Sequence, residues 1–161
     1  MRKNTRLRAY ARFLGTTFVV NLQGDEPLLE PEILSRTVRA YLESGLPCGT
    51  LAVPLKEEEA SQADVVKVVS TPAGRALYFS RAPLAGAWHH VGVYLFKRPA
   101  ALTFAELPPG RLEQAENLEQ LRLLENGFDI FVHQEDAELH GVDRPEDVAR
   151  VEELLTKRGL V

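Results

Sequence analysis

The sequence predicts an α/β domain whose sheet carries an inserted antiparallel hairpin. Short runs of β-branched and apolar residues, too short for helices, alternate with segments in which apolar residues recur at helical spacing. Two of the short runs are separated only by the turn formers of residues 71–74, which indicates the hairpin. With 161 residues, 45% of them hydrophobic and 26% charged, the chain fits one ordinary domain, residues 1–161, with enough apolar material for a core.

Turn and capping residues bound the elements of the first half. The apolar run 17–22 predicts a buried strand that ends in the turn formers of residues 24–27. Pro31 then opens a helix, which Gly45 and Pro47 terminate. The remaining predicted elements of this half are a strand at 49–53, an exposed helical turn at 57–59 and the hairpin strands 65–69 and 75–79.

The second half continues the alternation. A strand is predicted at 89–96, and a helix at 111–125 that ends at Gly127 and carries apolar residues along one side: Leu112, Ala115, Leu118 and Leu121. A short strand at 129–133 follows. Asp143, with Glu146 three residues later, forms a capping signature for a last helix that reaches Gly159, so on the residues alone Asp143 is explained as a helix cap.

Composition and missing motifs exclude several classes of function. The net charge of -4 argues against binding of nucleic acid by the whole protein, and no apolar stretch approaches the roughly 18 residues of a membrane span. Cys48 is the single cysteine, so no internal disulfide forms and a cytoplasmic location is expected. The chain contains no glycine-rich dinucleotide or phosphate loop, no nucleophile elbow, and no His or Cys pair spaced for zinc.

Polar residues follow the first predicted strand. Ligands of open α/β sheets gather beyond the carboxyl ends of strands, which is where Gln23 and Asp25 lie. Residues two apart on an extended chain share a face, so both side chains are predicted to project toward the same crevice. The alternative is that Asp25 only shapes the turn.

The strand at 89–96 has two faces of different character. One carries valines typical of a core, and the other carries His90, Gly92, Tyr94 and Phe96. A glycine between a histidine and a tyrosine leaves room for a ligand beside the backbone, so this second face is predicted to be a ligand wall. The alternative is that the histidine and the tyrosine are packing residues.

Two further polar groups are candidates for binding. Ser80 and Arg81 end a hairpin strand, and the guanidinium suits a carboxylate or phosphate, although a surface ion pair explains it equally well. Glu116, Glu119 and Gln120 are spaced to share one face of the helix at 111–125, where they would bond sugar hydroxyls or simply face solvent.

Five sequence blocks, in order along the chain, resemble those of the 3-deoxy-manno-octulosonate cytidylyltransferases. They are VNLQGDEP at 20–27, YFSR at 78–81, HVGVY at 90–94, LEQLR at 118–122 and GVDRPED at 141–147. The resemblance covers nearly the whole chain from Phe18 onward. It implies a partial Rossmann-like nucleotidyltransferase sheet, and an enzyme that transfers CMP from CTP to 3-deoxy-manno-octulosonate, with release of pyrophosphate, for lipopolysaccharide biosynthesis.

The same resemblance assigns roles to residues. Asp25 and Asp143 are implied to be the catalytic carboxylates that hold Mg²⁺ between them, in keeping with the preference of this ion for hard oxygen ligands. A homodimer is also implied, because the later half of the family's chain supplies its dimer contact. The sugar-acid pocket is implied to be lined by Gln23, Ser80, Arg81, His90, Tyr94, Glu119 and Gln120.

The chain departs from the family pattern in two places. Members begin with a strand and a loop, Pro-Ala-Arg…Arg-Leu-Pro-Gly-Lys-Pro, that holds the triphosphate, and this sequence contains no such segment. The loop at 82–89 is also shorter than in typical members. A fold without the first nucleotide-binding unit is therefore expected, with little or no activity of this chain by itself. The alternatives are a non-catalytic module that binds sugar or dimerises, and a nucleotidyltransferase for another sugar such as sialic acid.

Overall fold

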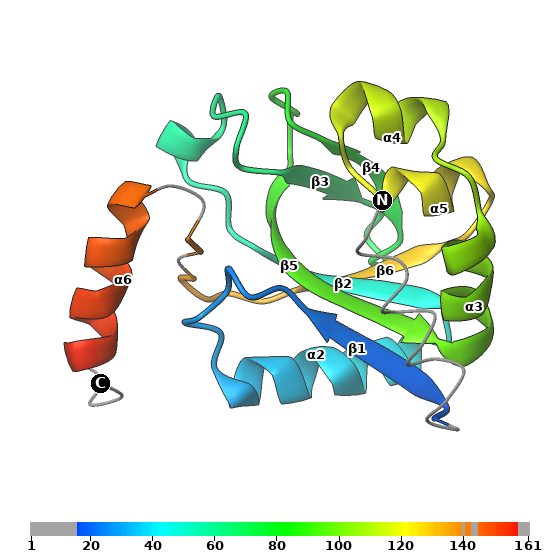
Figure 1. Cartoon of the computed structure of the whole chain (residues 1–161), viewed down its shortest axis with the longest axis horizontal. Helices are drawn as coiled ribbons and strands as arrows, with labels where there is room; N and C mark the ends of the chain where they lie inside the picture. The colour runs from blue at the N-terminus through cyan, green and yellow to red at the C-terminus, as the bar shows by residue number, and fades with distance from the viewer. Residues whose placement is uncertain (1–15, 140, 143–144, 158–161) are drawn as a thin grey trace.

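The structure, a computed structural model, describes residues 16–139, 141–142 and 145–157 (Figure 1). Its strands and helices alternate much as the sequence predicts. In chain order they are β1 (Phe18–Leu22), α2 (Pro31–Ser44), β2 (Cys48–Val53), the 3-10 turn η1 (Glu57–Glu59), β3 (Lys67–Ser70), β4 (Ala76–Ser80), β5 (Trp88–Lys97), α3 (Arg98–Glu106), α4 (Arg111–Glu116), α5 (Leu121–Glu125), β6 (Ile130–Gln134) and α6 (Pro145–Lys157).

The six strands form one sheet in the order β4-β3-β5-β2-β6, with β1 also paired to β5. Only β2 and β6 are parallel, and every other pair is antiparallel. Strand β5 is the centre of the sheet because three strands pair with it. Since β2 follows one edge of β5 almost from end to end, β3 and β1 share the other edge, at residues 88–89 and 93–97 respectively.

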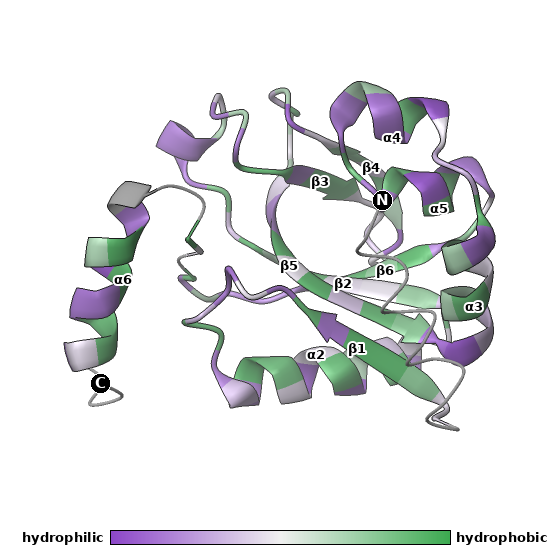
Figure 2. Ribbon diagram, viewed as in Figure 1, coloured by the Kyte–Doolittle hydropathy of each residue, from purple (hydrophilic) through white to green (hydrophobic). Residues whose placement is uncertain are grey.

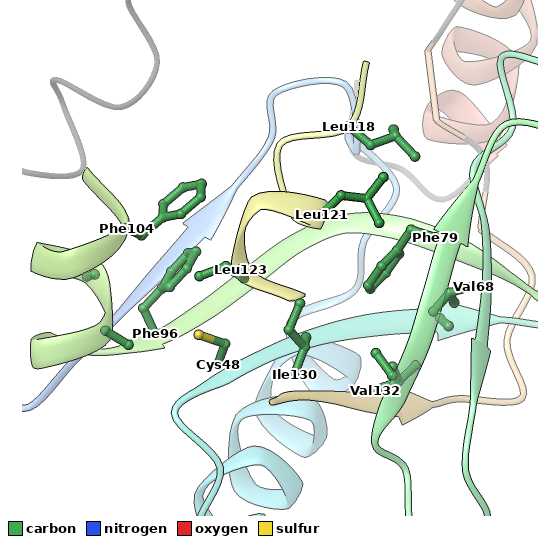
Figure 3. Close-up of a cluster of buried hydrophobic side chains, with 14 residues drawn as sticks. Cys48, Val68, Phe79, Phe96, Phe104, Leu118, Leu121, Leu123, Ile130 and Val132 are labelled. Atoms are coloured by element: carbon green, nitrogen blue, oxygen red, sulfur yellow. The ribbon is translucent and has the colours of Figure 1, made fainter. Parts of the chain in front are cut away.

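A hydrophobic core lies on each face of the sheet. Helix α2 covers one face, where Ile33 and Tyr41 pack with Val91 and Val93 of β5. Helices α3 and α5 cover the other, where Phe104 and Leu121 meet β-strand residues such as Phe96, Phe79 and Ile130 (Figure 3). Figure 2 shows the matching pattern of hydropathy, with hydrophobic central strands and alternating hydrophilic and hydrophobic stripes on α2 and α6. The predicted α/β class with its hairpin of β3 and β4 is confirmed.

Two helical predictions are wrong. The predicted helix at 111–125 is two short helices, because Asn117 adopts a left-handed conformation (φ 55°) that ends α4. Ala115, expected on its buried side, is exposed. Helix α3 was not predicted at all, although Pro99 lies in its first turn, where proline favours a helix start.

In the part of the chain that the structure describes, no helix has both the length and the apolar character needed to cross a membrane.

Candidate functional site

A bulge in β5 lies where its edge passes from β3 to β1. Thr50 of β2 pairs with Tyr94 and the next residue, Leu51, pairs with Val91, so Gly92 and Val93 have no counterpart in β2. Figure 1 shows that β5 bends strongly across the sheet. Bulges of this kind disrupt the ladder and bend the strand, and they occur often beside functional sites.

Neighbouring segments bond the backbone groups of the bulge. The Gly92 N–H donates to Oε1 of Glu26 at 2.9 Å, and the Gly92 carbonyl accepts from the Gln23 N–H at 2.9 Å. The Thr50 hydroxyl donates to the Val93 carbonyl at 2.7 Å. These bonds hold the loop after β1 against the middle of β5, and they bring Gln23 to the predicted ligand wall.

Gly92 has no room for a side chain. A Cβ atom at this position would lie 2.7 Å from Oε1 and 3.1 Å from Cβ of Gln23. Glycine is therefore needed here to make space for the side chain of Gln23. It is not needed to relieve backbone strain, since the φ of Gly92 is not in the left-handed region.

His90 is buried on the ligand-wall face, with 8% of its surface exposed. Its Nε2 lies 2.8 Å from the Thr50 hydroxyl, and its ring packs edge-on against Phe79 and tilted against Tyr94, at centroid distances of 5.2 and 5.4 Å. Burial, and then the charge of His89, lowers the pKa of His90 from 6.5 to about 3. His90 is therefore a neutral imidazole at physiological pH.

Gln120 lies across from Tyr94. The Tyr94 hydroxyl donates to Gln120 Oε1 at 3.5 Å, and Gln120 is only 4% exposed. Its Nε2 is buried without a hydrogen-bond partner in the described part of the chain. A buried, unpaired donor is costly, so this amide is suited to a ligand oxygen.

Charged groups gather around the Tyr94 hydroxyl. Burial raises the pKa of Tyr94, and the negative charges of Glu119, Asp25 and Glu26 raise it further, whereas the positive charge of Arg81 acts in the opposite sense. All four therefore lie close enough to Tyr94 to act on it. The loop after β1, the end of β4 and the start of α5 thus meet at β5.

Glu116 fixes the end of β4. Its carboxylate accepts from Ser80 Oγ and from the Arg81 N–H, both at 2.9 Å, and its backbone carbonyl accepts from Arg81 Nε at 3.1 Å. Arg81 Nη1 donates to the Ala63 carbonyl at 2.9 Å. Two of the five guanidinium N–H groups are thus used, which leaves three without a partner among the described residues. Ser80 is 2% exposed and engaged with Glu116, so it supports Arg81 from within the fold.

The predicted shared face of Glu116, Glu119 and Gln120 is wrong. Because Asn117 interrupts the helix, Glu116 belongs to α4, while Gln120 precedes α5 and is buried. Glu119 is exposed. The three residues therefore do not share one face. Glu116 bonds the end of β4, and Gln120 bonds Tyr94.

Lys67 supports the site and was not predicted from the sequence. It is fully buried, and its ammonium donates to the carbonyls of Gln62, of Val65 at 2.8 Å and of Arg81 at 2.9 Å. Burial, and then the charge of Arg81, lowers the pKa of Lys67. The only signal in the sequence is a lysine within an apolar run, which is unusual for a strand that is buried.

The two implied metal ligands differ in what the structure describes. Asp25 is exposed, and no hydrogen bond to its carboxylate occurs among the described residues. Asp143 lies outside the described residues. The residue before it, Val142, donates its N–H to the Asp25 carbonyl at 2.8 Å. Within residues 16–139, 141–142 and 145–157, no group of three or more His, Cys, Asp or Glu side chains is arranged to hold a metal ion.

Two cavities lie beside this site rather than in it. The first has a volume of about 310 Å³ and the second about 190 Å³, and both are bounded by Lys56, Glu59, His89 and Leu139. Neither is lined by a predicted site residue. The site is therefore identified by its hydrogen bonds and charges and not by a deep cavity.

Comparison with known proteins agrees with this arrangement. Residues 3–130 match the sequence model of the family described as cytidylyltransferase. The chain is 46% identical to the 3-deoxy-manno-octulosonate cytidylyltransferase of Nitratidesulfovibrio vulgaris (strain DP4), over 85% of this chain and 59% of that protein. It is 51% identical to the enzyme of the same name from Anaeromyxobacter sp. (strain Fw109-5), with the same two coverages.

A solved structure shares the fold. The structure of a CMP:2-keto-3-deoxy-manno-octonic acid synthetase complexed with CTP has a TM-score of 0.89 and 32% sequence identity, over 96% of this chain and 68% of that one. The chain spans about three fifths of the length of the two curated relatives. The chain belongs to the cytidylyltransferase family, and within it to the 3-deoxy-manno-octulosonate cytidylyltransferases.

Proposed function

We propose that this chain acts in the transfer of CMP from CTP to 3-deoxy-manno-octulosonate, with release of pyrophosphate, for lipopolysaccharide biosynthesis. One observation carries the proposal. Segments far apart in the sequence converge on β5: the loop after β1 bonds Gly92, Gln120 bonds the Tyr94 hydroxyl, and the charges of Asp25, Glu26, Arg81 and Glu119 act on Tyr94. The relatives' names and the CTP of the related structure support this choice of substrates.

The polar groups of the site suit a sugar acid. Arg81 has three N–H donors without a partner among the described residues that suit a carboxylate, and its orientation is fixed by Glu116. The Gln120 amide, the His90 imidazole and the side chain of Gln23 provide neutral partners for hydroxyl groups. These residues bind and orient the sugar acid so that its anomeric hydroxyl faces the α-phosphate of CTP. The new bond joins the hydroxyl oxygen to that phosphorus as the bond to pyrophosphate breaks.

The residues present fit a magnesium ion. Asp25 is an exposed carboxylate without a bonding partner in the described residues, and Val142 holds the segment that leads to Asp143 against its backbone. Asp25 and Asp143 would hold Mg²⁺, with phosphate oxygens and waters completing the shell. When bound, the ion would neutralise charge on the phosphates. The chain's own task is to keep the Asp25 carboxylate, which has no hydrogen-bond partner among the described residues, in the loop after β1.

The substitution Asp25→Asn tests this proposal. Because Asp25 is exposed and makes no side-chain hydrogen bond to a described residue, the free energy of unfolding should change by less than about 0.5 kcal/mol. In a full-length relative, the matching substitution should abolish release of pyrophosphate from CTP in the presence of the sugar acid and Mg²⁺. The counterpart of Asp136→Asn, another exposed aspartate, is the matched control in the same relative and should retain turnover.

Two results would reject the proposal. Unchanged turnover in Asp25→Asn would remove this residue from the mechanism. Calorimetry in which the unaltered chain binds neither sugar acid nor CTP would reject the function itself. Sialic acid, added as a competitor, should leave the rate unchanged if the site is selective for the octulosonate.

The proposal includes a homodimer that works in the cytoplasm. Sedimentation equilibrium should give twice the mass of one 18.0 kDa chain. A monomer at concentrations at which the protein binds sugar acid would reject the dimer without affecting the proposed reaction.

A further inference from the structure

The hydroxyl of Thr50 contacts both the Val93 carbonyl and the His90 imidazole, although Thr50 lies in none of the five sequence blocks. Thr50 lies in β2 and is 1% exposed. Its Oγ1 is 2.7 Å from the carbonyl oxygen of Val93 and 2.8 Å from Nε2 of His90. A carbonyl oxygen can only accept a hydrogen bond, so the single hydroxyl hydrogen of Thr50 points to Val93.

The direction of the Thr50 hydroxyl hydrogen determines which ring nitrogen of His90 carries the proton. Since the hydroxyl hydrogen is already used, the oxygen of Thr50 can only accept from the imidazole. Nε2 of His90 must therefore carry the hydrogen, and in a neutral imidazole Nδ1 is then an unprotonated acceptor.

The bulge makes the hydrogen bond from Thr50 to the Val93 carbonyl difficult to replace. Val93 is one of the two residues of β5 that have no counterpart in β2, so the β2 backbone offers its carbonyl no regular ladder bond. The Thr50 side chain fills that place. Burial of a carbonyl without a donor is unfavourable, and this keeps the hydroxyl turned toward Val93 and away from the imidazole.

Nδ1 of His90 is available to a ligand. It makes no hydrogen bond to the described residues, and it is not among their buried atoms without a partner. The ring lies against Tyr94, whose hydroxyl contacts Gln120. The lowered pKa of His90 keeps the imidazole neutral. An acceptor without charge thus lies beside Tyr94.

We propose that Thr50 is a positioning residue that fixes the Nε2–H tautomer of His90, so that Nδ1 accepts a hydrogen bond from a hydroxyl group of the substrate. The identity of that substrate as a sugar acid rests on the proposed function, whereas the tautomer does not. A lone pair at this point repels carboxylate and phosphate oxygens. The anionic end of the substrate must therefore bind elsewhere, and Arg81 has guanidinium donors that no described residue uses.

Nitrogen-15 NMR of the histidine rings in the ligand-free chain tests the tautomer directly. The chain has four histidines, and His90→Gln identifies the signals of His90 by their loss. The unaltered protein should show a protonated Nε2 and an unprotonated Nδ1. Thr50→Val, which has nearly the same shape but no hydroxyl, should move population to the Nδ1–H tautomer. Thr50→Ser keeps a hydroxyl and should restore the original spectrum.

Calorimetry tests the consequence for binding. In Thr50→Val the Kd for the sugar acid should rise roughly tenfold, the effect of one lost hydrogen bond. Thr50→Ser should be close to the unaltered protein. A general loss of structure would instead lower the thermal stability of Thr50→Val, which is measured alongside.

The outcomes separate this inference from the proposed function. An Nδ1–H tautomer in the unaltered protein would overturn the inference, and this result does not require Thr50→Val to fold. So would an unchanged spectrum or an unchanged Kd for the sugar acid in Thr50→Val. Absence of sugar binding to a protein with the expected tautomer would reject the substrate but leave the role of Thr50 in place.

Discussion

Lowering the pH from about 7 to about 5 should reduce the free energy of unfolding by about 2 kcal/mol through His90 alone. Burial, and then the charge of His89, lowers the pKa of His90 from 6.5 to about 3 in the folded protein. The folded state therefore stays neutral while the unfolded chain takes up a proton below about pH 6.5. Each pH unit in this window costs about 1.4 kcal/mol, and the span from 6.5 to about 5 gives about 2 kcal/mol.

Urea denaturation at the two pH values, with the unaltered protein and with His90→Gln, measures this contribution. The variant should lose about 2 kcal/mol less on acidification than the unaltered protein. Glu113 and Glu135 have lowered pKa values, so their contributions are lost only below the ordinary carboxyl value of 4.5 and lie outside the window. Equal losses in both proteins would show that His90 is protonated in the fold, which would refute the burial argument.

Three other substitutions address two residues that support the site and one buried ion pair between α4 and α5. Gly92→Ala should displace Gln23, whose side chain occupies the space of the new Cβ; calorimetry should show weaker binding of sugar acid, and unfolding should show a stability loss of about 1 kcal/mol. Lys67→Met should cost about 1–3 kcal/mol in urea denaturation, because buried carbonyls lose their donor. Arg122→Met should cost about 3–5 kcal/mol, because it leaves the carboxylate of Glu113 buried and unpaired.

Matched variants serve as controls. Gly92→Ala combined with Gln23→Ala should recover the stability but not the binding, which separates crowding from recognition. Glu153→Gln, in an exposed ion pair of α6, should change stability by less than about 0.5 kcal/mol. If Arg122→Met lost no more stability than this surface variant, the buried ion pair would not be important for stability. If Lys67→Met kept full stability, the same would hold for the buried lysine.

The sequence predicted most of the strands because burial dominates them; β1 was expected to be buried, but its residues are partly or fully exposed. Alternation along β5 correctly separated Val91, Val93 and Leu95, which pack on α2, from Phe96, which packs toward α3. The turn formers correctly located the hairpin. These features follow from local periodicity, which one sequence displays in full.

Other features depend on contacts between distant segments. The break at Asn117 could not be predicted from apolar spacing, since Leu118 and Leu121 continue the pattern into the next helix. The burial of Lys67 depends on a carbonyl of Arg81 and on two from the loop before β3. Its pairing partners, and not its residue type, determine the burial of Lys67.

The candidate site was predicted as separate residues, and mainly through resemblance to a family. Gln23, Arg81, Tyr94 and Gln120 lie close together in the structure, while Asp143 stays a prediction because it lies outside the described residues. The roles of Thr50 and Glu116 were not foreseen. Each acts through hydrogen bonds to a residue more than thirty positions away, which no local pattern encodes.

The number of extra residues in the β5 bulge has a consequence for the whole fold. An insertion of two residues in β5 leaves every later side chain on the face it would otherwise occupy. An insertion of one residue would turn Phe96 toward α2 and Leu95 toward α3. Residues 92 and 93 therefore change the local path of the strand without exchanging the contents of the two cores. The length of the bulge, two residues, is thus what lets the strand bend beside the candidate site while each core keeps its side chains.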